Sequence, residues 1–324
     1  MARILLKCRP TSAQLADRLA PPAPEGLELY LDAQDLQGDG WLSRIVDLMG
    51  RYARPEGFVI LVEGPVRSLD GSFFDLTRDT EASRELVRRV AALGRALGAK
   101  AANVHVIAPR ASPADFDEAR RAEALRGALP LLREYARVCL DAGMRPLVEN
   151  IPPVARQRES AYMYTPIGVA AEDLVWLARE VPHLGVTLDL SHAQLYLNAL
   201  RMPEEAAPAE VAPLLRRLRR QGGVATLEGY ADALAESLVN VHVSNASGLL
   251  GEGLPYGEGD ADLDAVVGRL LGMADYLVTE TLEPDPDRAV NMRDAQARMT
   301  NVRDRRVRGT TDGHELTWMR TDGS

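Results

Sequence analysis

Short apolar segments recur along the whole chain, and helical patterns separate most of them. Eight segments are predicted to be strands: residues 3–7, 27–31, 58–63, 102–107, 145–150, 184–189, 238–244 and 275–281. Most are continuous apolar runs rather than alternating ones, which is typical of strands buried on both faces of a parallel sheet. Strands that alternate with helices predict an α/β fold.

Apolar residues at helical spacing predict the intervening helices at residues 80–97, 115–141, 170–180, 262–271 and 288–302. Glycines stop two of them, at Gly98 and Gly143. Eight such units without an internal boundary favour one closed (β/α)8 TIM barrel over residues 1–302, rather than an open doubly wound sheet.

Two regions exceed what a minimal barrel needs. The segment between the sixth and seventh strands, residues 194–236, contains three prolines, a basic cluster at 216–220 and a Gly-Gly pair. This enlarged segment is either a lid or subunit contact on the active face, or a surface insertion with a solvated basic helix. The C-terminal tail, residues 303–324, is polar, and we expect an oligomer arm or partial disorder there.

Composition narrows the class of function. The chain has 324 residues and a net charge of −9, which argues against nucleic acid as a main partner, because phosphate binding needs clustered Lys and Arg. Cys8 and Cys139 are far apart and lack metal or redox spacing, which indicates a reducing compartment. With no signal-peptide layout and no apolar run of membrane-spanning length, we expect a cytoplasmic protein without membrane contact.

Four of the predicted strands end in a side chain that can bind a metal: Glu149, Asp189, His242 and Glu280. An unpaired charge in a buried strand is costly, so four such ends suggest one shared cation. The carboxyl ends of barrel strands converge on a single face. Three carboxylates and one imidazole suit one divalent ion such as Mn²⁺, Co²⁺, Mg²⁺ or Zn²⁺.

The motifs around these residues resemble those of the xylose-isomerase-like TIM-barrel superfamily. They are VEN at 148–150, TLDLSHA at 187–193, VHVS at 241–244, YGEGDAD at 256–262 and TET at 279–281. Their order and strand-end placement match from the fifth strand to the eighth, while the first half of the chain matches only in layout. That superfamily holds sugar isomerases and epimerases, inosose dehydratases and endonuclease-IV-type repair enzymes.

By this resemblance Glu149, Asp189, His242 and Glu280 form the single-metal site of a sugar epimerase. One of the two glutamates, Glu149 or Glu280, would remove a proton next to a carbonyl and the other would deliver one. A metal holding two substrate oxygens would stabilise the enediolate between these steps. The leading expectation is a metal-dependent isomerase or epimerase of a sugar, polyol or keto compound. A lyase of the inosose-dehydratase type is the alternative.

Further residues are expected near the substrate. His192 either contacts substrate or hydrogen-bonds a ligand carboxylate. Glu63 and His105 either hold a second cation together with Glu149 or bind substrate hydroxyls, and a buried core histidine is the plainer interpretation of His105. Glu28, within the second strand, either orients a catalytic neighbour or is simply paired.

Two loops complete the predicted site. Arg156 and Tyr164 belong to a loop that either covers the substrate or is ordinary surface. Glu258 lies in a Gly-Glu-Gly-Asp turn, interpreted as mainly structural, whose acids are expected to cap the following helix.

Other classes of function are weaker expectations. An endonuclease-IV-like phosphodiesterase with three metals needs more histidines than the five present, two of which, His183 and His314, are expected away from the site. A non-catalytic barrel would leave the strand-end charges uncompensated, and a multi-iron oxidase is a remote option. Because no glycine-rich phosphate loop is present, we expect a small, unphosphorylated substrate. By the habit of the family we also expect a homo-oligomer.

Overall fold

The computed structural model describes residues 1–110, 112, 117–156, 162–209, 211–221 and 223–318. Eight parallel strands close into a barrel in the order β1-β12-β9-β8-β5-β4-β3-β2. They are β1 (Arg3–Cys8), β2 (Gly26–Tyr30), β3 (Val59–Glu63), β4 (Ala101–His105), β5 (Arg145–Glu149), β8 (Gly185–Asp189), β9 (Leu238–Val243) and β12 (Tyr276–Thr279). The predicted TIM barrel is thus confirmed, with small differences at the strand ends.

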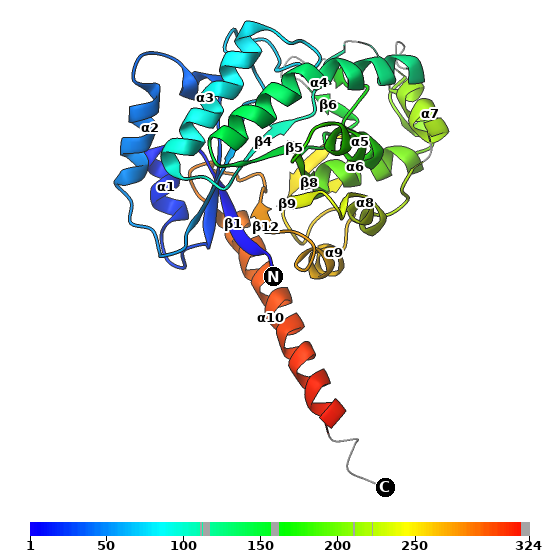
Figure 1. Cartoon of the computed structure of the whole chain (residues 1–324). Coiled ribbons are helices and arrows are strands. Elements are labelled where there is room, and N and C mark those ends of the chain that lie inside the picture. Colours follow the sequence, from blue (N-terminus) through cyan, green and yellow to red (C-terminus); the bar gives the residue numbers. More distant parts are fainter. Residues whose placement is uncertain (111, 113–116, 157–161, 210, 222, 319–324) are drawn as a thin grey trace.

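Helices surround this barrel (Figure 1). The predicted ones appear as α3 (Glu81–Leu97), α4 (Glu118–Asp141), α5 (Ala171–Glu180) and α9 (Leu263–Leu270). The first two β/α units carry α1 (Ser12–Arg18), a 3-10 turn η1 (Ala33–Leu36) and α2 (Trp41–Gly50), which were not predicted. With fewer than two full turns, α1 is too short for a helical period to show in the sequence.

Alternation along the strands separates the barrel interior into an apolar end and a polar end. Leu5 of β1 and Leu147 of β5 belong to the apolar cluster inside the barrel. Two positions later, on the same side of each strand, stand Lys7 and Glu149. The amino-terminal half of the interior is therefore plugged by apolar side chains, and the carboxyl-terminal half carries a ring of ionisable groups.

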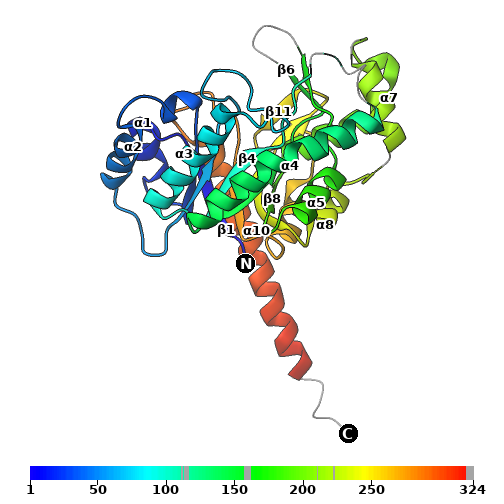
Figure 2. The ribbon, with the colours of Figure 1, turned by 45° about the horizontal axis from the view of Figure 1, so that its top comes forward.

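The enlarged segment between β8 and β9 folds into helices. α6 (Leu190–Arg201) begins directly after β8 and is followed by the 3-10 turn η3 (Glu204–Ala206), α7 (Ala212–Gln221) and α8 (Leu227–Leu234). The basic helix α7 packs against α6 at the edge of the molecule (Figure 2). Its Arg216 pairs with Glu204 at 2.9 Å, and its Arg219 donates to the Leu200 carbonyl at 3.1 Å.

The last helix is longer than predicted. α10 spans Val290–Trp318, whereas the sequence predicted a helix over 288–302 followed by a polar tail. It packs against β1 and α9 and then continues away from the barrel (Figure 1). Beyond residue 302 the helix has little core to face, so the apolar repeat that revealed its first part disappears although the backbone remains helical.

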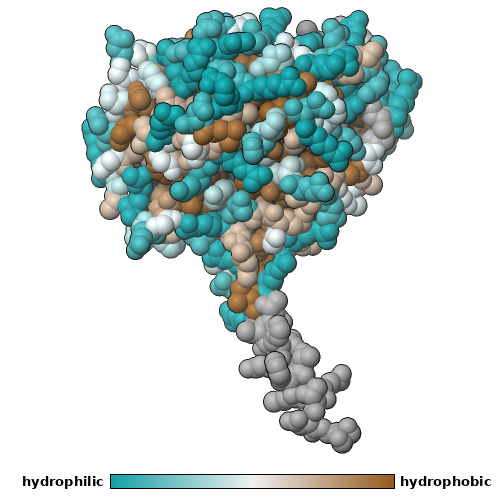
Figure 3. Space-filling view, in the orientation of Figure 1, coloured by the Kyte–Doolittle hydropathy of each residue, from teal (hydrophilic) through white to brown (hydrophobic). Residues whose placement is uncertain are grey.

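Polar side chains cover most of the face seen in Figure 3, and apolar ones appear there in small separate patches. Within the described ranges, no helix combines the length and the apolar character needed to cross a bilayer.

Candidate metal centre

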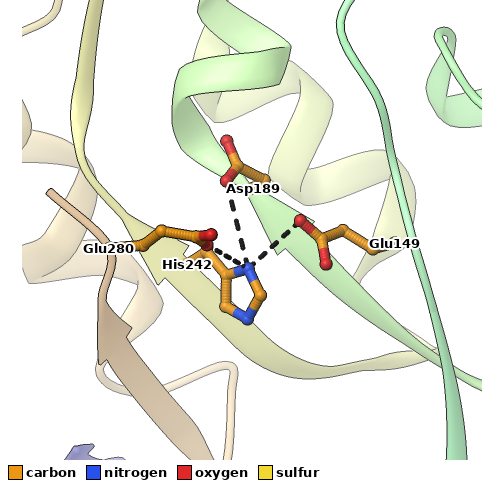
Figure 4. Close-up of side chains that lie close together, drawn as sticks. All are labelled: Glu149, Asp189, His242 and Glu280. Atoms are coloured by element: carbon orange, nitrogen blue, oxygen red, sulfur yellow. Dashed lines mark hydrogen bonds and ion pairs between the residues drawn. The ribbon is translucent and has the colours of Figure 1, made fainter. Parts of the chain in front are cut away.

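Four predicted residues meet at the carboxyl ends of the barrel strands (Figure 4). Glu149 ends β5, Asp189 ends β8, His242 lies in β9, and Glu280 directly follows β12. Parallel register sets Asp189 opposite His242 on the neighbouring strand. One potential ligand atom from each of the four residues lies within 4.8 Å of the others.

The imidazole of His242 is at the middle of this cluster. Its Nε2 lies 2.6 Å from Glu28 Oε2, so that Nδ1 faces the other three residues. Nδ1 lies 3.1 Å from Glu149 Oε1, 2.5 Å from Glu280 Oε2 and 4.0 Å from Asp189 Oδ2. Both His242 and Glu28 are fully buried.

The second oxygen of each carboxylate is held by another group. Lys7 donates to Glu280 Oε1, and Asn103 donates to Glu149 Oε2. Asp189 Oδ1 accepts from the backbone N–H of His192 at 2.6 Å, because Asp189 also caps α6.

One atom of each ligand therefore remains directed at a common centre. The buried Oε2 of Glu280 makes no well-directed hydrogen bond to any part of the chain that the structure describes. An orphaned carboxylate oxygen, two further carboxylate oxygens and one imidazole nitrogen fit a divalent cation.

The pKa values show an excess of negative charge here. Burial raises the pKa of Asp189 to about 7. Burial also raises the pKa of Glu63 to about 8, against the lowering influence of Lys7. Burial alone would lower the pKa of His242, yet Glu149 and other carboxylates raise it well above its ordinary value. Each shift reports a buried group that lacks sufficient positive charge around it.

The pKa values of the two other histidines of the site are shifted in opposite directions. Burial lowers the pKa of His105, which lies in β4 with Nε2 3.6 Å from Glu149 Oε2. Burial would also lower the pKa of His192, but Asp189 and Glu252 raise it to about 9. His192 lies in the first turn of α6, with Nδ1 2.9 Å from the Asn150 carbonyl oxygen. At neutral pH, His105 is therefore neutral and His192 is protonated.

A cavity of about 300 Å³ opens beside the cluster. Its lining includes Glu63, His105, Asp189, His192 and Glu280. Two hairpins, which were not predicted, also contribute to it: β6 (Val154–Arg156) with β7 (Tyr162–Tyr164), and β10 (Asn245–Ser247) with β11 (Gly251–Leu254). A wider groove of about 910 Å³ adjoins the cavity, and Val66, Ala155 and Met163 line both.

The remaining predicted site residues lie apart from the cluster. Tyr164 is buried in β7, where its backbone pairs with Arg110, and Glu258 is exposed in the turn before α9. Neither is among the described residues that line the cavity. The backbone of Arg156 belongs to β6, but its side chain lies outside the described part of the chain.

The expectation that the acids of the Gly-Glu-Gly-Asp turn cap the next helix was wrong. The cap of α9 is Asp262, two residues later, which accepts from the Ala265 N–H at 3.4 Å. Asp260 instead accepts from Asn198 Nδ2 at 2.8 Å and from the Gly248 N–H at 3.1 Å, which ties the turn to α6 and the β10–β11 hairpin.

Two residues that contact the cluster, Lys7 and Asn103, were missed by sequence reasoning. A signal was present for Lys7, which is one of only two lysines in a chain with 36 arginines and lies within an apolar strand. Asn103 precedes His105 by two positions and therefore shares its side of β4.

Residues 25–302 match a protein-family model described as the xylose isomerase-like TIM barrel. The chain belongs to this family. Solved structures with the same fold include a D-tagatose 3-epimerase-like protein, with 18% identity and a TM-score of 0.61 over 94% of this chain and 99% of that one. At such identity the likeness shows the fold alone.

Two further structures of xylose isomerase-like fold are similar over nearly their whole length. The 3-keto-D-glucoside 4-epimerase of E. coli has 12% identity and a TM-score of 0.58, covering 94% of this chain and 100% of that one. A protein from Thermus thermophilus, soaked with zinc chloride, has 19% identity and a TM-score of 0.58, covering 91% of this chain and 97% of that one. No curated protein matches the sequence.

Proposed function

We propose that the chain is a metal-dependent isomerase or epimerase of an uncharged sugar, polyol or related keto compound. The observation that carries this proposal is the convergence of Glu149, Asp189, His242 and Glu280, each with its other polar atom held by a separate partner. Family membership supports it, because two similar folds bear the names of a D-tagatose 3-epimerase-like protein and a 3-keto-D-glucoside 4-epimerase.

The two glutamates are suited to move protons. A divalent ion held by the four residues would supply positive charge that stabilises the anion left when a proton departs beside a carbonyl. Glu149 and Glu280 reach the cluster from opposite sides of His242 (Figure 4). Burial would raise the pKa of Glu149, but His105 and His242 lower it to about 2, so Glu149 is ionised at neutral pH. We assign one glutamate to remove the proton and the other to return one.

The cavity lining favours an uncharged, hydroxyl-rich substrate. Its described residues include four carboxylates and two histidines but no arginine or lysine. A phosphate or carboxylate on the substrate would meet these four carboxylates with only the protonated His192 as a positive partner among the described lining residues. His105, which is neutral, and His192 are placed to hydrogen-bond substrate hydroxyls.

A lyase is the second candidate, and one observation favours it. Loss of a hydroxyl needs an acid beside the leaving oxygen, and the protonated His192 lines the same cavity. Both reactions begin with the same proton abstraction, so the product distinguishes them.

The test combines metal analysis with proton exchange. Purified protein is expected to hold one divalent ion per chain and to catalyse deuterium incorporation from D₂O into a ketose at the carbon next to its carbonyl, followed by NMR. Glu149→Gln should lower that rate by roughly 10²–10⁴-fold while the unfolding transition is kept. Glu236→Gln, which removes an exposed charge just before β9 at the opposite end of the barrel, is the matched control. A chain that binds no divalent metal, or a Glu149→Gln variant with full exchange activity, refutes the proposal.

A further inference from the structure

We propose that the ammonium group of Lys7 is the built-in second cation of this centre, so that the centre takes one divalent ion rather than two. The proposal rests on the metal centre of the proposed function. It assigns a role to Lys7 and excludes a second ion at Glu63, His105 and Glu149.

Lys7 is surrounded by acidic side chains at the carboxyl-terminal end of the barrel strands, which we call the barrel mouth. It stands near the end of β1, in register with Glu28 of β2, and only 4% of its side chain is exposed. Its Nζ forms ion pairs with Glu63 Oε2 and Glu280 Oε1 and lies 5.9 Å from the centre of the Tyr30 ring. Burial alone would lower the pKa of Lys7, but Glu280 and Glu63 raise it well above its ordinary value, so the side chain carries a full charge.

Two further groups of potential ligands border the main cluster, and both depend on Glu63. One comprises Glu28, Glu63 and His242, and the other comprises Glu63, His105 and Glu149. In the first group, Glu63 Oε2 lies 3.9 Å from His242 Nε2, and Lys7 contacts that same oxygen. Lys7 thus occupies the ligand atom that a metal ion would need there.

Neighbouring hydrogen-bond and ion-pair donors also contact the carboxylates of the second group. Glu63 Oε1 lies 3.9 Å from His105 Nε2, which in turn lies 3.6 Å from Glu149 Oε2. Asn103 already donates to that oxygen of Glu149, while Lys7 neutralises Glu63 through its other oxygen. The group therefore keeps the spacing of a metal site but little of the negative charge that would hold an ion.

The balance of charges around the centre also favours a single divalent ion. Five buried or half-buried carboxylates surround the mouth: Glu28, Glu63, Glu149, Asp189 and Glu280. One divalent ion and Lys7 neutralise three of these five charges and leave two. A second divalent ion together with Lys7 would cancel every carboxylate charge, whereas the same ion in place of Lys7 would still leave one negative charge at the centre.

Metal stoichiometry tests this role without relying on activity. Equilibrium dialysis with Mn²⁺, read by elemental analysis and by electron paramagnetic resonance, is applied to the wild type, Lys7→Gln, and the double variant Lys7→Gln/Glu63→Gln. Lys100→Gln is the matched control, because it removes the other lysine, which is exposed just before β4 at the opposite end of the barrel. Circular dichroism verifies that each variant is folded.

The expected saturation is one Mn²⁺ per chain for the wild type and Lys100→Gln, two for Lys7→Gln with a spin-coupled signal, and one again for the double variant. If Lys7→Gln also saturates at one ion, Lys7 only orients Glu63 and Glu280, and the proposal is wrong while the proposed function stands. Two ions on the wild type overturn the proposal even if Lys7→Gln does not fold. A wild type without metal overturns both.

Discussion

Glu28→Gln is expected to weaken metal binding although Glu28 is not one of the four converging ligands. Glu28 lies in β2, and its Oε2 is 2.6 Å from His242 Nε2. Its Oε1 accepts from Asn240 Nδ2 at 3.2 Å. The carboxylate thereby fixes the orientation of the imidazole, keeps Nδ1 directed at the cluster and makes that nitrogen a better electron donor.

The size of the effect follows from the burial of the pair. Glutamine keeps the shape of the side chain, so the substitution removes mainly the charge that faces His242 Nε2. Loss of such an outer partner typically costs 10–100-fold in metal affinity, or about 1.4–2.7 kcal/mol. We expect the upper half of this range, because both side chains are 0% exposed and water cannot replace the lost charge.

The assay is a competition titration of Mn²⁺ between the protein and a chelating dye, performed on wild type, Glu28→Gln and Glu236→Gln. Glu236 carries the same charge but is exposed before β9, at the far end of the barrel. Equal affinities for Glu28→Gln and the wild type would refute the idea that Glu28 tunes His242. Equal losses in both variants would show a general effect of net charge instead.

Two other predictions concern stability. In chelator, protonated His192 should stabilise the fold below its ordinary pKa of 6.5, and this contribution should disappear as the pH rises through its folded value of about 9. This contribution to the free energy of unfolding is at most about 3 kcal/mol. The melting temperatures of His192→Gln and the wild type should therefore converge at alkaline pH, and a difference that does not change with pH would contradict the assignment. Gly259→Ala should cost roughly 1–3 kcal/mol in urea unfolding, because φ is +99° and a Cβ would lie 2.6 Å from the Ala246 carbonyl oxygen and from Asn245 Oδ1. Gly248→Ala, at φ +59° with no neighbouring atom within 4 Å, should cost clearly less, and equal losses would mean that the contact is relieved by movement of the turn.

The sequence predicted the barrel because its strands are apolar runs with regular spacing, and it predicted the four central residues because charge at the end of such a run is conspicuous. Glu149, Asp189 and Glu280 each follow at least two apolar or β-branched positions. The same signal indicated Glu63, whereas His105, which lies inside its strand after Asn103 and Val104, was indicated by the family resemblance. The sequence does not reveal which oxygen or nitrogen of each residue faces the centre, because side chains on other strands determine that orientation.

Lys7 and Asn103 illustrate this limit. Each lies on the inner side of its strand, but a single polar residue in a short apolar run does not reveal which side of the sheet it faces until the register is known. The hairpins after β5 and β9 escaped prediction for a similar reason. Their strands have only three or four residues, which is too few for alternation to stand out.

In the absence of a metal ion, the positive charges of His242 and Lys7 stabilise the cluster of carboxylates. Metal binding is therefore coupled to proton release. His242 lies 3.1 Å from Glu149 and 2.5 Å from Glu280, and the surrounding carboxylates keep its pKa well above the ordinary value, so the imidazole is protonated. A metal ion binds the neutral imidazole, so it must displace a proton that these same carboxylates stabilise. Lys7 cannot be displaced in this way, because its chain is anchored in β1. At the centre, the positive charge of His242 is therefore exchangeable and that of Lys7 is permanent, and the permanent charge of Lys7 is the electrostatic reason to expect a single ion.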